Sequence, residues 1–179
     1  MRIRILGIDP GLAELGWAVI EDLGTKYNLI ASGTIITAHD ANATRHNDLA
    51  RRTNYIALEL SVIIWLDLPD AAAIELWEYH GRDITPAAQQ VQYVCGAIGE
   101  VLRRNCDIPR TLHSTQSVKS IVCGTRSATK REIQNRVRAL CGLAPGLRLG
   151  EHEADAIAVA IAHSVRGRHA LKRAAGGVP

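Results

Sequence analysis

Apolar and polar positions near the start of the chain follow the pattern of β-strands separated by short turns. Three stretches rich in apolar and β-branched residues are expected to form strands, at residues 2–9, 15–22 and 27–37. Pro10 and Gly11 predict a turn after the first of them. Because the connections between the three stretches are short, we expect the strands to pair as an antiparallel meander.

The pattern then changes to the spacing of helices. Residues 45–67 repeat apolar side chains along one helical face, and a short apolar run at 71–76 follows. A helix between two strands is typical of a crossover between parallel strands, so we expect 71–76 to lie inside the sheet. The remaining predicted elements are a helix at 86–104, a strand at 110–113, a short helix at 114–122, a helix from the Thr129/Glu132 capping box to Gly142, and a final helix from about 151 to 166.

This order of elements predicts an α/β fold with a mixed sheet, in which three antiparallel strands precede parallel ones and helices cover both faces. The 179 residues contain no repeat and no long linker, so we expect one domain over 1–168 and a flexible tail over 169–179. The most apolar candidate for a membrane segment, 56–68, contains two acids and is too short to span a bilayer. With no signal peptide visible, we expect a cytoplasmic protein without membrane contact.

Two acidic residues stand at or near the ends of predicted strands. Asp9 follows an apolar strand and so brings a carboxylate to the rim of the sheet, although an Asp before Pro-Gly can also simply shape a turn. Glu75 lies in a strand that should be buried, and a buried acid needs a partner or a metal. Glu78 is the alternative acid, but it lies on the opposite face of that strand and nearer the loop.

A second group of ionisable residues opens the final predicted helix. His152 and Asp155 are three residues apart and share a helical face, which Glu151 can also reach, whereas Glu153 points elsewhere. The small apolar residues that follow Asp155 allow close packing on the sheet. Hydrolysis of a phosphodiester needs an activated water and a stabilised leaving oxygen, which two divalent ions about 4 Å apart can provide. Three carboxylates and an imidazole would supply ligands for such ions.

Charge is distributed unevenly, although the formal net charge is only +3. Residues 1–102 carry 7 basic and 13 acidic side chains, whereas residues 103–148 carry 10 basic and 2 acidic ones. Such a basic segment can simply be a solvated surface. Next to a candidate metal site, it indicates a phosphate backbone as the substrate.

Four motifs together resemble those of the RuvC Holliday-junction resolvases, in the same order from about residue 3 to residue 163. They are Gly-Ile-Asp-Pro-Gly-Leu with Gly-Trp shortly after it, Ala-Ile-Glu in the middle strand, Val-Lys-x-x-Val-x-Gly-x-x-x-Ala-x-Lys, and Ala-Asp-Ala-Ile-Ala-Val-Ala-Ile-x-His. Each motif is weak alone, but the ordered set is specific. The resemblance implies a ribonuclease H-like fold, a homodimer, and paired symmetric nicking of four-way DNA junctions during recombination and repair.

The resemblance also implies the residues and cofactors of the site. The family's acidic positions fall on Asp9, Glu75, His152 and Asp155, which would be catalytic and would ligate Mg²⁺ or Mn²⁺, with two ions in each active site. A branch-migration motor complex would be a further partner where the host has one.

This chain departs from the commoner family pattern at His152, where most members have Asp and some have His. An imidazole brings no negative charge and can ligate an ion or move a proton. Because nitrogen suits borderline metals, we expect His152 to favour Mn²⁺ over Mg²⁺. A second departure lies three residues after Glu75, where the family's usual aromatic residue is Glu78, flanked by Trp77 and Tyr79. One of these two aromatics is expected to stack at the junction centre, with a core Trp77 as an equal alternative.

The basic segment fits a nucleic-acid substrate. Lys119 and Lys130 match two lysines that the family places near its active site, where they would contact phosphates. Arg126 is a further expected contact to the DNA backbone, and a solvated surface is the alternative. The same expectation extends to the arginines at 131, 136 and 138.

Other functions remain open at this stage. A sugar kinase or actin-like ATPase also begins with Gly-x-Asp-x-Gly, but that fold needs two such domains and a much longer chain. A junction-binding protein without catalysis is compatible with His152, although the other three acids are intact. A related nuclease acting on RNA or on other branched DNA, such as a phage-encoded enzyme, is a third alternative.

Overall fold

The computed structural model describes residues 2–76, 85–105, 107–144 and 146–174, with side chains up to residue 168 in the last stretch. Its elements in chain order are β1 (Ile3–Asp9), β2 (Glu14–Asp22), β3 (Tyr27–Ile36), α1 (Arg45–Asp67), β4 (Ala71–Leu76), α2 (Pro86–Arg104), β5 (Arg110–Ser114), α3 (Thr115–Cys123), α4 (Lys130–Cys141) and α5 (Glu151–Ala174). All the strands and helices expected from the sequence are present. None of the helices in the described part of the chain has the length and apolar character needed to cross a bilayer.

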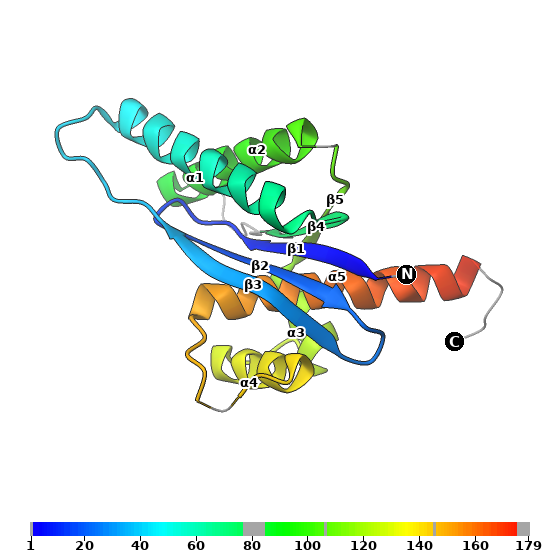
Figure 1. Ribbon diagram of the computed structural model, residues 1–179. Helices are drawn as coiled ribbons and strands as arrows, with labels where there is room; N and C mark the ends of the chain where they lie inside the picture. Colours follow the sequence, from blue (N-terminus) through cyan, green and yellow to red (C-terminus); the bar gives the residue numbers. More distant parts are fainter. Residues whose placement is uncertain (1, 77–84, 106, 145, 175–179) are drawn as a thin grey trace.

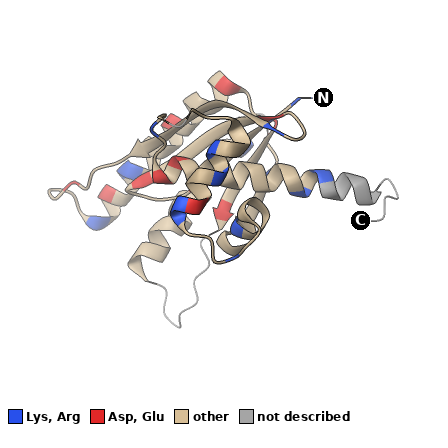
Figure 2. Cartoon of the chain, turned by 90° about the horizontal axis from the view of Figure 1, so that it is seen from below, with Lys and Arg blue, Asp and Glu red and all other residues tan. Residues whose placement is uncertain are grey.

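The five strands form one mixed sheet in the order β3-β2-β1-β4-β5. The pairs β1/β2 and β2/β3 are antiparallel, whereas β1/β4 and β4/β5 are parallel. Helices α1 and α2 cover one face of the sheet, and α3, α4 and α5 cover the other (Figure 1). Figure 2 views this second face, along which α5 runs. The prediction of a mixed α/β sheet flanked by helices on both faces is therefore confirmed.

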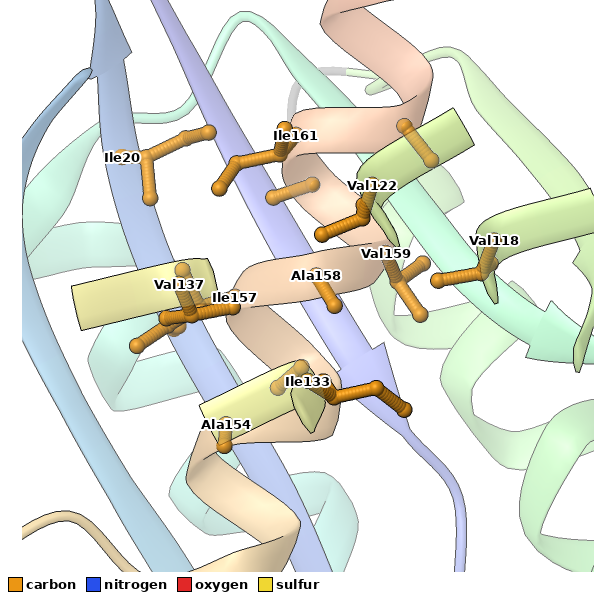
Figure 3. Packing of buried hydrophobic residues seen from close by; sticks show 14 of the residues in the cluster. Ile20, Val118, Val122, Ile133, Val137, Ala154, Ile157, Ala158, Val159 and Ile161 are labelled. Carbon is orange, nitrogen blue, oxygen red and sulfur yellow. The ribbon is translucent and has the colours of Figure 1, made fainter. Parts of the chain in front are cut away.

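Each face of the sheet has its own hydrophobic core because apolar side chains alternate along the strands. On the α1/α2 face, Leu6 and Ile8 of β1 pack with Ile56 and Leu60 of α1. The core on the other face is built around α5, with side chains from α3, α4 and β2 (Figure 3). Seven consecutive residues of α5, 156–162, are almost completely buried. Because α5 is packed tightly in this core, the position of its first turn relative to the sheet is fixed.

Two glycines allow α5 to lie unusually close to the sheet. A Cβ added at Gly7 would lie 2.0 Å from the carbonyl oxygen of Ala156, and one added at Gly16 would lie 2.1 Å from that of His152. Both distances are far below van der Waals contact. Glycine is therefore required at these two positions by the helix backbone, and the small side chains of Ala156 and Ala160 complete the close fit.

Helix α5 extends beyond its expected end near residue 166. It continues through Gly167 to Ala174. Gly124 and Gly142 end α3 and α4 with positive φ angles of 78° and 62°, but Gly167 stays within the helix. Arg168 beyond it donates hydrogen bonds to Asp22. The backbone of residues 169–174, the first part of the expected tail, is therefore helical, while a single domain over 1–168 stays a prediction.

A buried polar network ties the start of α1 to the turn that follows β1. Asp48, whose side chain is only 6% exposed, accepts hydrogen bonds from Arg51 and Arg52 and contacts His39. Arg52 donates from Nε to the hydroxyl of Thr37, which in turn donates to the carbonyl oxygen of Leu12. The turn between β1 and β2 is thus held by side chains from α1.

We predict that Asp48→Asn lowers the midpoint of thermal unfolding at pH 7. The hydrogen bond with His39, followed by that from Arg51, holds the pKa of the Asp48 carboxyl well below its usual range. A depressed carboxyl pKa contributes stability above the unfolded value of 3.8 that is lost as the pH falls. Calorimetry of both proteins should therefore show a difference at pH 7 that shrinks below pH ~4. Equal midpoints at pH 7 would contradict this role of Asp48.

Candidate active site

The candidate site lies at the edge of the sheet where β1 and β4 end. These strands are parallel and in register with Ile8 beside Ile74, so the next residues, Asp9 and Glu75, are neighbours at the same edge. The side chain of Asp9 is 19% exposed, and Glu75 is partly buried. The strand register therefore places these two carboxylates side by side.

The first turn of α5 brings His152 and Asp155 to the same edge. The imidazole of His152 lies between two carboxylates: its Nδ1 is 2.7 Å from Oδ2 of Asp9, and its Nε2 is 3.2 Å from Oε2 of Glu14. Asp155 is partly buried and lies close enough to Asp9 and His152 to interact with their charges. The close approach at Gly16, whose Cα pairs with that of Asp9, is what allows the helix to reach the strand end.

Burial and mutual repulsion perturb the acids of the site. Burial raises the pKa of Glu75 to about 7, a hydrogen bond from Thr115 opposes this rise, and the charges of Asp9 and Asp155 add to it. Burial followed by the charge of Asp9 raises the pKa of Asp155 to about 6. Such perturbed carboxyl groups at one rim of a sheet are typical of functional sites.

Basic side chains from α3 and α4 act on the same carboxylates. The charges of Lys130 and Lys119 lower the pKa of Asp155 and so partly offset its burial. Lys130 also forms an ion pair with Glu151 in the first turn of α5. The capping box at Thr129 and Glu132, expected from the sequence, is present at the start of α4 and fixes the position of Lys130.

The other residues expected at the site have different positions. Arg126 is exposed and lines a cavity beside α3. Glu153 points away from the site, as expected, and accepts a hydrogen bond from Ser32 of β3. Trp77 and Tyr79, expected to contact DNA, lie outside the described residues.

Two residues of the site were missed by the sequence analysis. Glu14 starts β2 on the same face as Gly16, and the pairing of Gly16 with Asp9 would have placed this acid next to the site. Thr115 opens α3 two residues after His113, the β5 partner of Glu75. Both signals depend on strand register, which the apolar pattern does not specify.

The donor set suits a divalent cation. Burial and the charge of Asp9 raise the pKa values of Glu75 and Asp155, so a bound positive charge would relieve this repulsion, and hard oxygen ligands are those that Mg²⁺ and Mn²⁺ prefer. Within the described residues, no three His, Cys, Asp or Glu side chains stand ready as a ligand set. Both ring nitrogens of His152 face carboxylates, those of Asp9 and Glu14.

Comparison with known proteins shows what the chain is similar to. The family model described as "Crossover junction endodeoxyribonuclease RuvC" matches residues 5–163. A protein of that name from Allorhizobium ampelinum is 33% identical over 176 residues, covering 98% of both chains. Another, from Parvibaculum lavamentivorans, is 35% identical over 168 residues, covering 93% of this chain and 89% of the relative.

Solved structures agree with the fold. The chain is similar to Thermus thermophilus RuvC in complex with a Holliday junction substrate, with a TM-score of 0.80, 25% identity, and coverage of 94% of this chain and 96% of that one. The yeast mitochondrial Holliday junction resolvase has a TM-score of 0.64 at 13% identity, covering 93% of this chain and 82% of that one. This second similarity concerns the fold alone.

We predict that Glu75→Gln stabilises the metal-free protein at pH 8. Because the folded state raises the pKa of Glu75 to about 7 from 4.5, its contribution to stability is full below the unfolded value and is lost as the pH rises through the folded value. The neutral amide avoids this loss, so its free energy of unfolding in EDTA should exceed that of the wild type by roughly 1–2 kcal/mol at pH 8. The difference should shrink at pH 5.

Urea unfolding at the two pH values provides the measurement. Glu59→Gln, which removes a carboxylate from α1 on the other face of the sheet, is the matched control and should show no such gain. A Glu75→Gln protein that is less stable than the wild type at pH 8 would rule out repulsion and burial as the dominant effects on this side chain.

Proposed function

Because this chain belongs to the RuvC family of crossover junction endodeoxyribonucleases, we propose that it resolves four-way DNA junctions by paired symmetric nicks made with the carboxylates at the edge of its sheet. As a member of that family, it is a hydrolase and a Holliday junction resolvase nuclease of recombination and repair. The observation that carries the proposed site is that the carboxylate of Asp9, which contacts the imidazole of His152, lies close enough to Glu75 and Asp155 for its charge to raise their pKa values.

In this proposal, Asp9, Glu75, His152 and Asp155 hold two divalent ions, Mg²⁺ or Mn²⁺. When bound, the ions supply an activated water and stabilise the leaving oxygen. The burial of Glu75 and Asp155 keeps bulk water away and strengthens the charge interactions in the site. The two ring nitrogens of His152 face Asp9 and Glu14, and one of them would serve as a ligand to a bound ion.

The basic residues position the phosphate backbone. Lys119 and Lys130 already interact electrostatically with Asp155, so a phosphate bound to either ammonium group would lie next to the carboxylates. The N-terminus of α4, where Lys130 lies, adds the positive end of a helix dipole. Arg126, Trp77 and Tyr79 are proposed to contact the DNA farther from the scissile phosphate.

We propose a homodimer as the active form. A four-way junction is cut on two strands of like polarity, and the described part of one chain contains one such carboxylate site, so a symmetric pair of chains matches the symmetry of the junction. A branch-migration motor is a proposed further partner. Because the proposed substrate is DNA, we propose a cytoplasmic location.

We predict that the wild type cuts a mobile four-way DNA junction symmetrically in the presence of Mg²⁺ or Mn²⁺ and that Asp9→Asn does not. The variant removes the carboxylate that contacts His152 and neighbours Glu75, so the cleavage rate should fall by at least about 10³-fold while junction binding persists. Gel analysis of labelled junctions, with a band-shift assay for binding, measures both. Binding without cleavage by the wild type would instead support a junction-binding protein. Preferential cleavage of an RNA or another branched substrate would support the related-nuclease alternative.

We predict that the wild type is more active with Mn²⁺ than with Mg²⁺ and that His152→Asp reduces or reverses this preference. Imidazole nitrogen favours borderline metals, whereas a carboxylate restores a hard oxygen ligand. Cleavage rates with each ion across a pH series, together with calorimetric titration of each ion into the protein, test this prediction. Equal rates and equal affinities for the two ions in the wild type at every pH would contradict it.

A further inference from the structure

A cavity outside the carboxylate site lies between α3 and the second half of α5. Its volume is about 890 Å³. The residues that line it are Ser114, Gln116, Ser117, Ser120, Ile121, Arg126, Val165 and Arg166. Most of these side chains are polar, and Ile121 and Val165 contribute its apolar part. None of the roles proposed for the active site uses this cavity.

The described side chains that line the cavity carry positive charge and no negative charge. Arg126 and Arg166 both line it, and no Asp or Glu is among its lining residues in the part of the chain that the structure describes. The guanidinium of Arg166 donates to a neutral acceptor, the hydroxyl of Ser117, at 2.6 Å. This hydrogen bond orients Arg166 at the cavity and leaves its charge free to act on a ligand. Basic positions, drawn blue, lie on the described part of this half of α5, whereas acidic positions, drawn red, lie near the start of the helix (Figure 2).

The cavity begins next to the carboxylate site. Ser114 is the β5 partner of Leu76, the residue after Glu75. Thr115, which follows Ser114, contacts Glu75. Helix α3 therefore contributes to both the cavity and the carboxylate site. Gln116 and Ser117 line the cavity, while the charge of Lys119 lowers the pKa of Asp155.

We propose that this cavity binds a phosphodiester of the DNA backbone, on a nucleotide removed from the phosphate held at the carboxylates. Two guanidinium groups and several hydroxyl groups are the donors that proteins use for phosphate oxygens, and contacts of this kind set the register of a duplex on a protein. The N-terminus of α3, capped by Ser114, adds a favourable dipole for an anion. This inference rests on the proposed function and adds Arg166 and Ser117 to the DNA-contacting residues.

The test uses the full chain in EDTA and a fluorescent four-way junction, with the dissociation constant measured by anisotropy over a series of NaCl concentrations. Arg166→Gln and Arg126→Gln are each expected to weaken binding several-fold and to reduce the slope of log Kd against log [NaCl] by about 1, the value for one phosphate contact. The double variant should reduce the slope by about 2. Ser117→Ala, which leaves Arg166 charged but no longer oriented, should have a smaller effect in the same direction.

Arg2→Gln is the matched control. Arg2 is an exposed arginine, 79% accessible, before the start of β1, at the opposite end of that strand from Asp9, and its loss should leave the slope unchanged. Slopes for Arg166→Gln and Arg126→Gln equal to that of the wild type would overturn the proposal. Sodium phosphate that raises the melting temperature of the wild type but not of Arg166→Gln, with unchanged slopes, would assign the cavity to a free anion and also overturn it.

A failure of the proposed function gives a different result. In that case the wild type neither prefers a junction to a linear duplex nor cuts it. The salt series is then repeated with the linear duplex, where the same reductions in slope by Arg166→Gln and Arg126→Gln would still support a phosphate site in the cavity. Unchanged slopes there would overturn it.

Discussion

Repulsion among carboxylates held at one partly buried edge of the sheet is the interaction around which this molecule is organised. Glu75 and Asp155 both resist ionisation because they are buried and because Asp9 lies beside them. Folding therefore disfavours the ionised forms of Glu75 and Asp155, which are the forms that would bind a metal ion. Two hydrophobic cores, one on each face of the sheet, must supply the stability that holds the acids together.

Positive charge near the site comes from elements that do not carry the acids. Lys119 lies on α3 and Lys130 at the start of α4, and both offset the burial of Asp155. The ion pair between Lys130 and Glu151 links α4 to the first turn of α5. Helix α3 therefore supplies Lys119 to the electrostatic environment of the acids and also lines the proposed phosphate cavity, so substrate contacts and acid positions both depend on the packing of this helix.

Most of the fold follows from the period of the apolar residues. The change from strand to helical spacing after β3 predicts the crossover to β4, and the capping box predicts the start of α4. Helix α5 continues past its expected end near residue 166, because Gly167 keeps helical geometry where Gly142 ends α4 with a positive φ, and Arg168 then donates hydrogen bonds to Asp22. Local composition cannot reveal such a long-range contact.

The candidate site was predictable to a similar degree and for similar reasons. Asp9, Glu75, His152 and Asp155 stand out because acids in or next to apolar runs need an explanation. Glu14 does not stand out, since an acid at the start of a strand is ordinary. Its contact with His152 depends on the register of β2 on β1 and on how closely α5 approaches the sheet. Neither can be predicted from a local sequence pattern.

The two glycines under α5 have a consequence for how this chain can change over time. A side chain at Gly7 or Gly16 would collide with the backbone carbonyl oxygens of Ala156 and His152, not only with their side chains. A smaller residue on the helix would leave those oxygens in place. Second-site substitutions on α5 therefore offer no route to suppress a change at either glycine, and these positions stay fixed whatever sequence the helix acquires.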